Sequence, residues 1–304
     1  MPITLFGRAA AGVRRRRRSE AETASAPTPQ PALRVLTLNV AHARRQAQHQ
    51  ALLREPTLRR NLEAIAAVLG RERPDVVALQ EADGPSAWSG GFDHVETLAR
   101  LAGFDHAFRG EHNPFSLGRL DLSSGTALLS RLPLEAPRSH AFQQTWRDTK
   151  GFVAATVTPD TLGGAPVDVV SIHLDFLAER VRRRQVEQLV DRFSGSGRPL
   201  AVLGDFNCEL GERKRSFDLL AHELRLRPVE RGGAPTFPSW RPLMRLDWIL
   251  ISPELEFVRY RTLEDRLSDH LGVVAEMRLR DAAASTATAA EQIGATTLRR
   301  RRAR

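Results

Sequence analysis

Acidic and amide side chains follow the ends of several apolar runs, and Asp205 with Asn207 is the clearest pair. In LAVLGDFNCEL, residues 200–210, four apolar residues lead to Gly204, and an acid and an amide follow two positions apart. This segment alone fits either a surface turn after a buried strand or a pair of ligands held over a chemical step. The other strand ends have to decide between the two interpretations.

The same arrangement recurs at five other places in the chain. The residues concerned are Asn39, Glu81, His173 with Asp175, Asp247, and Asp269 with His270. One polar residue at a strand end is usually a turn former. A set made only of Asn, Asp, Glu and His suits an oxygen-ligated metal and proton transfer near neutral pH. Magnesium in particular binds carboxylate and carbonyl oxygens together with water and substrate phosphates.

The elements that must position these residues alternate between buried strands and amphipathic helices. Strands are expected at 34–40, 75–81, 126–130, 152–157, 167–174, 199–207, 246–252 and 271–279, and helices at 57–70, 95–102, 176–193 and 216–222. Residues 103–125 have few apolar runs and are expected to form a long loop region. Strands buried on both faces together with amphipathic helices predict a layered α/β sandwich around a mixed sheet.

The expected helix at 176–193 carries more specific predictions. Asp175 is expected to be its N-cap. The residues expected on its buried side are Leu177, Val181, Leu189, Val190 and Phe193. The arginines at 182–184 are expected to form a solvated face. Elsewhere, Trp240 and Trp248 are expected to be packing aromatics, with a substrate groove as the alternative for Trp240.

The 304-residue chain is expected to form one domain at 33–280, between disordered basic tails at 1–32 and 281–304. Six arginines against two glutamates in the first tail and five arginines against two acids in the second supply seven of the nine net positive charges. The central domain therefore keeps only +2. Such tails either contact nucleic acid or an anionic membrane, or are simply solvated.

Composition also bears on compartment and assembly. No apolar run approaches the roughly 18 residues that span a bilayer, and the start lacks a secretory pattern, so we expect a cytoplasmic protein without a transmembrane segment. Cys208 is the only cysteine, which excludes an intrachain disulfide and a cysteine-based zinc cage. It is expected to be a small buried residue. We expect a monomer.

The ordered series TLNV, LQE, SIHLD, GDFN, RLDWIL and SDH resembles the endonuclease/exonuclease/phosphatase superfamily, the group of DNase I-like nucleases, neutral sphingomyelinases and inositol-polyphosphate phosphatases. The resemblance spans about residues 33–280. It implies a four-layer α/β sandwich, with two mixed β-sheets flanked by helices. It also implies metal-dependent hydrolysis of a phosphoester, with Mg²⁺ as the cofactor and Mn²⁺ as a possible substitute.

The resemblance assigns roles to the residues of the metal and of the attacking water. Glu81 resembles the main magnesium ligand, and Asn39 stands beside it at metal and phosphate. Asp269 would reach a second metal or support the first. Asp205 resembles the acid that orients or deprotonates the attacking water, and Asn207 the amide that holds water and phosphate in place.

The remaining assignments concern the phosphate. His270 resembles the histidine that stabilises the transition state, and Asp247 its carboxylate partner, which fixes the tautomer and ring angle. His173 matches a phosphate-contacting histidine of DNase-like and sphingomyelinase-like members. Lys150 is a candidate substrate contact without a spacing argument.

The substrate stays open between nucleic acid, a phospholipid or inositol phosphate, and a small phosphoester. The abasic-site endonuclease branch is disfavoured, because SIHLD stands where those members carry a tyrosine-bearing motif and Tyr260 is the only tyrosine. A central charge of only +2 weakens the case for an extended DNA groove. The contrasting class is a catalytically silent module that uses its arginine tails to hold nucleic acid or membrane.

Overall fold

The computed structural model describes residues 31–280, except 48, 50–52, 87–88, 111, 113–114, 118–119, 123, 143–149, 210–214 and 230–232. The tails expected at 1–32 and 281–304 lie outside the described residues, apart from residues 31–32. Among the helices described, none has both the length and the apolar character needed to cross a membrane.

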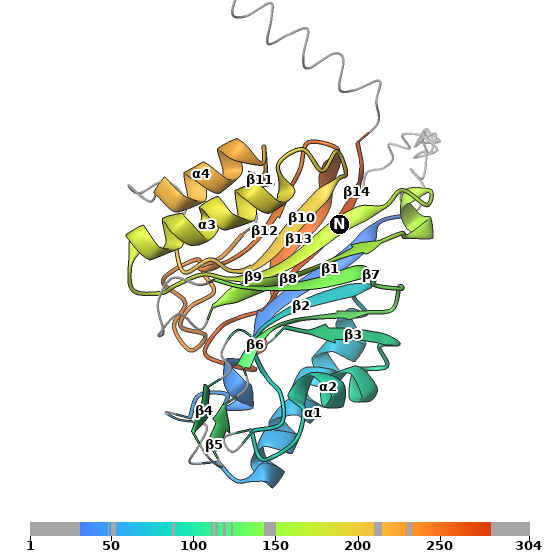
Figure 1. Ribbon diagram of the computed structural model, residues 1–304. Helices are drawn as coiled ribbons and strands as arrows, with labels where there is room; N and C mark the ends of the chain where they lie inside the picture. Colours follow the sequence, from blue (N-terminus) through green and yellow to red (C-terminus); the bar gives the residue numbers. More distant parts are fainter. Residues whose placement is uncertain are drawn as a thin grey trace, which may run out of the picture. The chain divides into compact units, whose positions relative to one another are not determined.

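Two six-stranded mixed sheets form the centre of the domain (Figure 1). The first has the strand order β13 (Leu255–Thr262), β14 (Val273–Leu279), β1 (Leu33–Asn39), β2 (Val76–Asp83), β6 (Ser124–Ser130) and β3 (His106–Arg109). The second has the order β11 (Arg227–Pro228), β12 (Asp247–Ile251), β10 (Leu200–Asp205), β9 (Val167–His173), β8 (Gly151–Val157) and β7 (Glu135–Ala141). A separate pair joins β4 (Phe115–Leu117) to β5 (Leu120–Leu122). Each large sheet has one parallel pair at its centre, β1 with β2 and β9 with β10.

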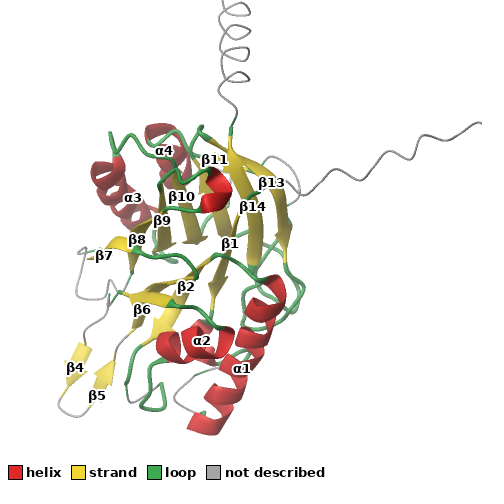
Figure 2. Ribbon diagram, turned by 90° about the vertical axis from the view of Figure 1, so that its right-hand side faces the viewer, coloured by secondary structure: helices red, strands yellow, loops and turns green. Residues whose placement is uncertain are grey.

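Helices cover the outer face of each sheet, which gives four layers. Figure 2 shows α1 (Glu55–Glu72) and α2 (His94–Ala102) on the side of the first sheet, and α3 (Glu179–Phe193) and α4 (Arg215–Glu223) on the side of the second. The short helices η1 (Ala41–Ala43) and η3 (Asp160–Leu162) lie in connections. The predicted four-layer α/β sandwich is therefore confirmed.

Alternation along the central strands explains why their sequences read as continuous apolar runs. In β1, Leu36 and Leu38 belong to the core between the first sheet and its helices, whereas Leu33 and Val35 belong to the core between the two sheets. A third core joins the second sheet to α3 and α4. Each fully buried Leu or Val contributes about 1.5–3 kcal/mol, so burial on both sides favours apolar residues at most positions of the central strands.

A buried polar network links the two sheets. Thr37 Oγ1 donates to Gln80 Oε1 at 3.3 Å, Gln80 Nε2 donates to Ser171 Oγ at 3.1 Å, and Ser171 Oγ donates to the Leu79 carbonyl at 3.0 Å. The side chains of Thr37, Gln80 and Ser171 are completely buried. Because buried polar groups are costly without partners, this network favours one alignment of β1, β2 and β9.

Some sequence predictions were wrong at sheet edges. The loop expected at 103–125 contains β3, β4, β5 and the start of β6. The edge strands β7 and β13 were not predicted, because their outward residues are largely exposed and interrupt the apolar pattern. Edge strands bury only part of their surface, so hydrophobicity marks them weakly.

The prediction for the first turn of α3 was also wrong. The helix begins at Glu179, because Asp175 Oδ1 accepts the Leu177 and Ala178 amides and holds the preceding residues in a turn. The residue at the N-cap is Ala178, not Asp175, and Leu177 is 76% exposed instead of buried. Arg182 is buried and donates to the Asp175 carbonyl, so it is not part of a solvated face.

Candidate active site

Strand ends from both sheets bring the predicted side chains together. In the register of the second sheet, Asp205 at the end of β10 lies directly between His173 on β9 and Asp247 on β12. In the first sheet, Asn39 ends β1 beside β2, which carries Glu81. The carboxyl ends of the two parallel pairs therefore supply four of the predicted residues, and the antiparallel β12 supplies the fifth at its first position.

Asp205 is the centre of the cluster and is almost fully buried. Its Oδ1 accepts a hydrogen bond from the Asn207 backbone N–H at 2.9 Å, and its Oδ2 accepts one from Asn39 Nδ2 at 3.0 Å. The Nε2 atoms of His173 and His270 lie 3.4 and 3.7 Å from the same Oδ2. The hydrogen bond from Asn39 crosses between the sheets, so their packing sets the position of this carboxylate.

His270 is held from three sides. Its Nδ1 is 2.9 Å from Asp247 Oδ2, its backbone N–H donates to Ser268 Oγ, and the Phe237 ring packs at 4.8 Å between centroids. Ser268 Oγ also donates to the Asn39 carbonyl at 2.6 Å. Ser268 therefore connects the loop that carries His270 to the end of β1. This connection was not predicted from the sequence.

The surroundings of Asp205 and His270 shift their pKa values so that the two side chains carry opposite charges at neutral pH. Burial alone would lower the pKa of His270, but Asp247 and Asp205 outweigh burial and raise it to about 10. Burial raises the pKa of Asp205 to about 6, with Asp247 adding to the increase and His270 opposing it. At neutral pH, Asp205 is therefore mostly ionised and His270 is a cation.

Glu81 lies at an irregular point of β2. The pairing of β2 with β6 shifts by one residue between Leu79 and Ala82, and Glu81 itself has φ +51°. A β-bulge of this kind redirects a side chain out of the regular alternation. Although burial opposes ionisation of Glu81, its pKa lies below the usual range because Lys150 and His42 stabilise the charged form.

Lys150 lies inside the cluster. Its Nζ is 2.9 Å from His173 Nε2 and 3.7 Å from Glu81 Oε1. Burial, together with the charge of Lys150, lowers the pKa of His173 well below its usual value. His173 is therefore a neutral imidazole that can donate or accept a hydrogen bond, and the nearby positive charge resides on Lys150.

Asn207 and Asp269 occupy the margin of the cluster. Asn207 has φ +49°, and its Nδ2 donates to the Leu174 carbonyl at 2.9 Å, which connects the end of β10 to the end of β9. Asp269 Oδ2 forms an ion pair with Arg44. The charge of Asp269 still contributes to the raised pKa of His270.

A second histidine–aspartate pair was missed by sequence reasoning. His42 Nδ1 lies 2.8 Å from Oδ1 of the completely buried Asp83, and His42 Nε2 lies 3.3 Å from Glu81 Oε2. Burial lowers the pKa of His42, but Asp83 and Glu81 outweigh burial and raise it. The arrangement repeats the pair formed by Asp247 and His270.

The backbone around His42 is unusual. Ala41, His42 and Ala43 have φ values of +46°, +55° and +57°. Consecutive left-handed residues other than glycine are costly and concentrate at functional sites. The sequence held one signal for the pair: Asp83 follows Glu81 by two positions at a strand end, the spacing of Asp205 and Asn207.

The donor set fits a hard divalent cation. Glu81 Oε1 and Asp205 Oδ2 lie 4.0 and 3.4 Å from the same atom, His173 Nε2, and Asn39 Nδ2 donates to Asp205 Oδ2. Carboxylate and amide oxygens are the ligands that Mg²⁺ prefers.

A second possible metal group overlaps this one. Ligand atoms of Asp205, Asp247 and His270 lie within 4.8 Å of one another. Asp247 Oδ1 is buried and has no hydrogen-bond partner among the described residues. Because the raised pKa makes His270 a cation at neutral pH, a metal that included His270 would have to displace its proton.

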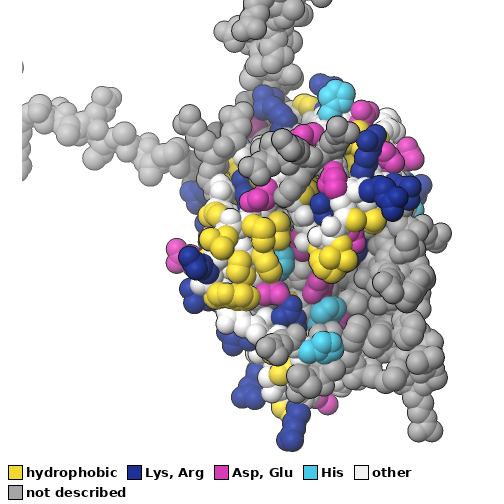
Figure 3. All heavy atoms as spheres, turned by 90° about the vertical axis from the view of Figure 1, so that its left-hand side faces the viewer, with side chains coloured by type: hydrophobic (Ala, Val, Ile, Leu, Met, Phe, Trp, Pro, Cys, Tyr) yellow, Lys and Arg dark blue, Asp and Glu magenta, His cyan; other side chains and the backbone are white. Residues whose placement is uncertain are grey.

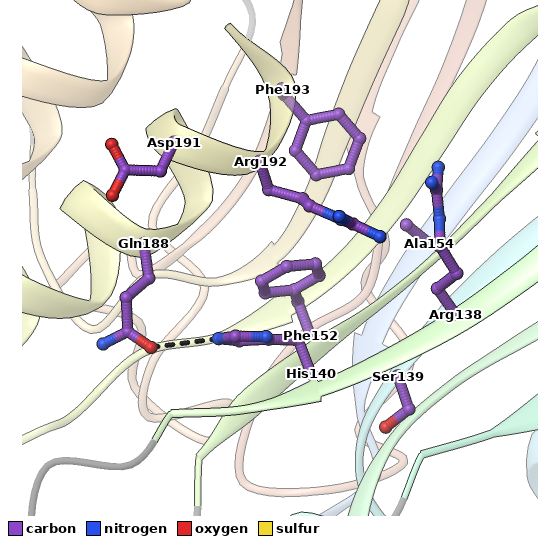
Figure 4. Close-up of a pocket in the computed structure, with 9 residues that line it drawn as sticks. All are labelled: Arg138, Ser139, His140, Phe152, Ala154, Gln188, Asp191, Arg192 and Phe193. Atoms are coloured by element: carbon purple, nitrogen blue, oxygen red, sulfur yellow. Dashed lines mark hydrogen bonds between the residues drawn. The ribbon is translucent and has the colours of Figure 1, made fainter.

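A groove elsewhere on the domain is separate from this cluster. It has a volume of about 370 Å³ and lies between α3, β7 and β8. Figure 4 shows His140 hydrogen-bonded to Gln188 at 2.9 Å, with Phe152 beside it and two arginines at the edge. None of its lining residues belongs to the predicted site.

Comparison with known proteins agrees with the fold. The model of the endonuclease/exonuclease/phosphatase family matches residues 36–270, so the chain belongs to this family. Membership makes it a hydrolase that acts on phosphoric ester bonds. No curated protein matches the sequence.

Solved structures show the same fold at low identity. An endonuclease/exonuclease/phosphatase from Beutenbergia cavernae has 23% identity and a TM-score of 0.63, with 83% of this chain and 72% of that chain covered. The human nocturnin catalytic domain has 22% identity and a TM-score of 0.63, with 83% and 96% covered. A mannosyl-6-phosphatase from Bacteroides thetaiotaomicron has 15% identity and a TM-score of 0.62, with 81% and 99% covered.

Proposed function

We propose that the chain is a Mg²⁺-dependent phosphodiesterase in which an activated water attacks phosphorus in line with the leaving group. The observation that carries the proposal is the position of Asp205, a buried carboxylate whose Oδ2 lies 3.4 Å from His173 Nε2 and 3.7 Å from His270 Nε2. Asp205, which can accept a proton, thus lies next to His270, which can donate a proton or stabilise negative charge.

The metal would be held by Glu81 and Asn39, beside Asp205. Bound Mg²⁺ supplies Lewis-acid charge neutralisation and orients the phosphate. The lowered pKa of Glu81 keeps its carboxylate ionised and ready for a cation. Lys150 lies near the same carboxylate and would add a second positive charge for the phosphate.

The chain's own residues would manage the protons. Asp205, held by the Asn207 amide and by Asn39 Nδ2, would orient the water and accept its proton. His270, kept cationic by Asp247, would stabilise negative charge on the phosphoryl oxygens or protonate the leaving oxygen. His173, a neutral imidazole, would hydrogen-bond a phosphate oxygen.

The proposal is tested by hydrolysis of bis-p-nitrophenyl phosphate against p-nitrophenyl phosphate, with Mg²⁺, with Mn²⁺ and with EDTA. We expect metal-dependent cleavage of the diester that exceeds cleavage of the monoester, and its loss in EDTA. Cleavage that persists in EDTA, or a preference for the monoester, would contradict the proposal.

A catalytically silent module would cleave neither ester. We do not favour this alternative, because the residues proposed as metal ligands, as the general base and as the histidines that contact the phosphate are all present in the sequence. A cytoplasmic location, a monomeric state and anion contacts of the arginine-rich tails remain predictions.

A further inference from the structure

Large hydrophobic side chains are exposed mainly on two loops. Seven are prominent among the described residues: Phe176 at 63%, Leu177 at 76%, Trp240 at 51%, Leu243 at 64%, Met244 at 38%, Leu101 at 39% and Val258 at 41%. The first five lie in the loop from β9 to α3 and in the loop that leads into β12. We call these five residues the apolar rim.

The first loop is fastened to the proposed catalytic residues. The Leu174 amide donates to the Asp205 carbonyl at 3.0 Å, and the Leu174 carbonyl accepts Asn207 Nδ2. Asp175 Oδ1 accepts the Leu177 amide at 2.9 Å, which fixes the turn. Leu177 is therefore exposed on a backbone held in place, only four residues after His173.

The second loop is fastened to the other side of the cluster. The Phe237 ring packs on His270, and the Ser239 amide donates to the Asp269 carbonyl at 2.8 Å. The Leu243 and Met244 amides both donate to the Phe237 carbonyl, which closes the loop on itself. Both parts of the apolar rim are thus one short connection away from residues of the site.

Figure 3 shows hydrophobic side chains in two groups on one face of the domain, with acidic and histidine side chains between them. Isolated exposed hydrophobic residues are ordinary on a protein surface, but apolar groups gathered around a polar centre mark an interaction surface. Hydration of Leu177 and Leu243 in particular is unfavourable, since both are more than three-fifths exposed.

Arginines lie in the second loop and in the first turns of α3, which directly follows the first loop. Residues 236–246 contain Arg241 and Arg245 and no acidic residue. Residues 175–184 contain four arginines against two acids, and Arg180, Arg183 and Arg184 are exposed. Apolar side chains beside arginines complement a lipid surface, where hydrocarbon lies beneath anionic headgroups.

We propose that the apolar rim docks on an anionic lipid bilayer, with Leu177 and Leu243 reaching the acyl boundary. The exposed arginines beside the rim, Arg180, Arg184 and Arg241, would meet the headgroups. A nucleic acid is the competing partner, because aromatic side chains and arginines also bind single strands. The aliphatic side chains of the rim favour lipid over nucleic acid, since Leu177, Leu243 and Met244 cannot stack on bases as an aromatic ring does. The proposal rests on the proposed function only in placing phosphoester chemistry next to the headgroup layer.

The test is co-sedimentation of the full chain with vesicles of phosphatidylcholine and phosphatidylglycerol. The variant Leu177→Ser/Leu243→Ser is compared with Leu101→Ser/Val258→Ser, which removes two exposed hydrophobic residues outside the rim. Binding is measured in low salt and in about 1 M NaCl, where a Debye length of about 3 Å suppresses attraction by the arginine-rich tails. We expect the rim variant to lose on the order of tenfold in vesicle partitioning at high salt, and the control variant to keep it.

Three other outcomes overturn the proposal. Equal vesicle binding by the two variants would show that the rim does not insert. The absence of wild-type binding at high salt would show that charge alone attracts the chain to lipid and that the rim does not insert. A rim variant that loses binding to single-stranded DNA but keeps binding to vesicles would point to nucleic acid.

A second measurement separates this proposal from the proposed function. Hydrolysis of soluble bis-p-nitrophenyl phosphate is expected to be unchanged in the rim variant, which also shows that the variant is folded. Vesicle binding needs no catalysis, so docking can succeed in a chain that hydrolyses nothing. Conversely, a wild-type enzyme that cleaves the soluble diester but ignores vesicles would contradict docking alone.

Discussion

Asp205 Oδ2 lies 3.7 Å from His270 Nε2, and the two side chains approach each other from β10 and from the loop before β14. They differ in charge because they differ in surroundings. Burial raises the pKa of Asp205 to about 6, whereas Asp247 and Asp205 together overcome burial and raise the pKa of His270 to about 10. Two groups with separated pKa values are what a base and an acid acting in one reaction require.

The first prediction is a bell-shaped dependence of kcat/KM on pH. Activity should rise as pH increases through about 6, because Asp205 must lose its proton to act as a base. It should fall as pH increases through about 10, because His270 then loses the proton that makes it cationic. Initial rates on the soluble diester across this range, at saturating Mg²⁺, are the measurement.

A variant identifies the upper limb of this profile. Asp247→Asn removes the charge that does most to raise the pKa of His270, so the upper limb should move to lower pH. The lower limb should move down as well, since Asp247 also raises the pKa of Asp205. An unchanged upper limb would assign it to a group other than His270.

The second prediction concerns the two residues directly. Asp205→Ala or His270→Ala should lower turnover by about 10²-fold or more, because general acid–base catalysis contributes 10²–10⁴-fold. Circular dichroism and thermal melting check that both variants fold. Near wild-type turnover in either purified, folded variant would refute the mechanism.

Much of the fold and part of the site could be predicted because both depend on local sequence. Apolar runs such as LAVLG identify central strands, and the residue that follows each run lies at the strand end. Leu177 shows the limit of this reasoning. Its spacing matches the buried face of α3, but Asp175 binds the local amides and starts the helix later, so Leu177 is exposed.

Residues that act through distant partners were harder to predict. His42 meets Asp83 across 41 positions of sequence, and Arg44 meets Asp269 across 225. The position of Asp83 two residues after Glu81 gives a weak local signal for the first pair, but no local pattern connects either acid to its basic partner. The edge strand β7 was missed for a different reason, since five of its seven residues are exposed and carry no apolar signal.

The third prediction is that His42 positions Glu81. His42→Ala should weaken Mn²⁺ binding on the order of tenfold, as loss of an outer partner of a ligand typically does. Calorimetry of Mn²⁺ binding measures this without relying on activity. His140→Ala is the matched control, because His140 hydrogen-bonds Gln188 in the separate groove. If both variants bind Mn²⁺ as the wild type does, His42 has no role in holding the ligand.

The fourth prediction explains the glycine that precedes Asp205. Gly204 has φ +155°, and a Cβ at this position would collide with the Ile172 carbonyl of the neighbouring strand β9. Since both strands are buried, neither can move away cheaply. Gly204→Ala should therefore destabilise the domain by about 2 kcal/mol or more. It should also lower turnover, because any shift of β10 displaces Asp205.

Gly70 provides the comparison. It lies in α1, and a Cβ there meets nothing within 4 Å. Gly70→Ala should stabilise the domain by about 0.5–1 kcal/mol, since alanine favours the helix and glycine does not. Urea unfolding of both variants gives the two free energies. If Gly204→Ala unfolded at the wild-type midpoint with full activity, the close approach of β9 and β10 would not be what requires a glycine immediately before the catalytic acid.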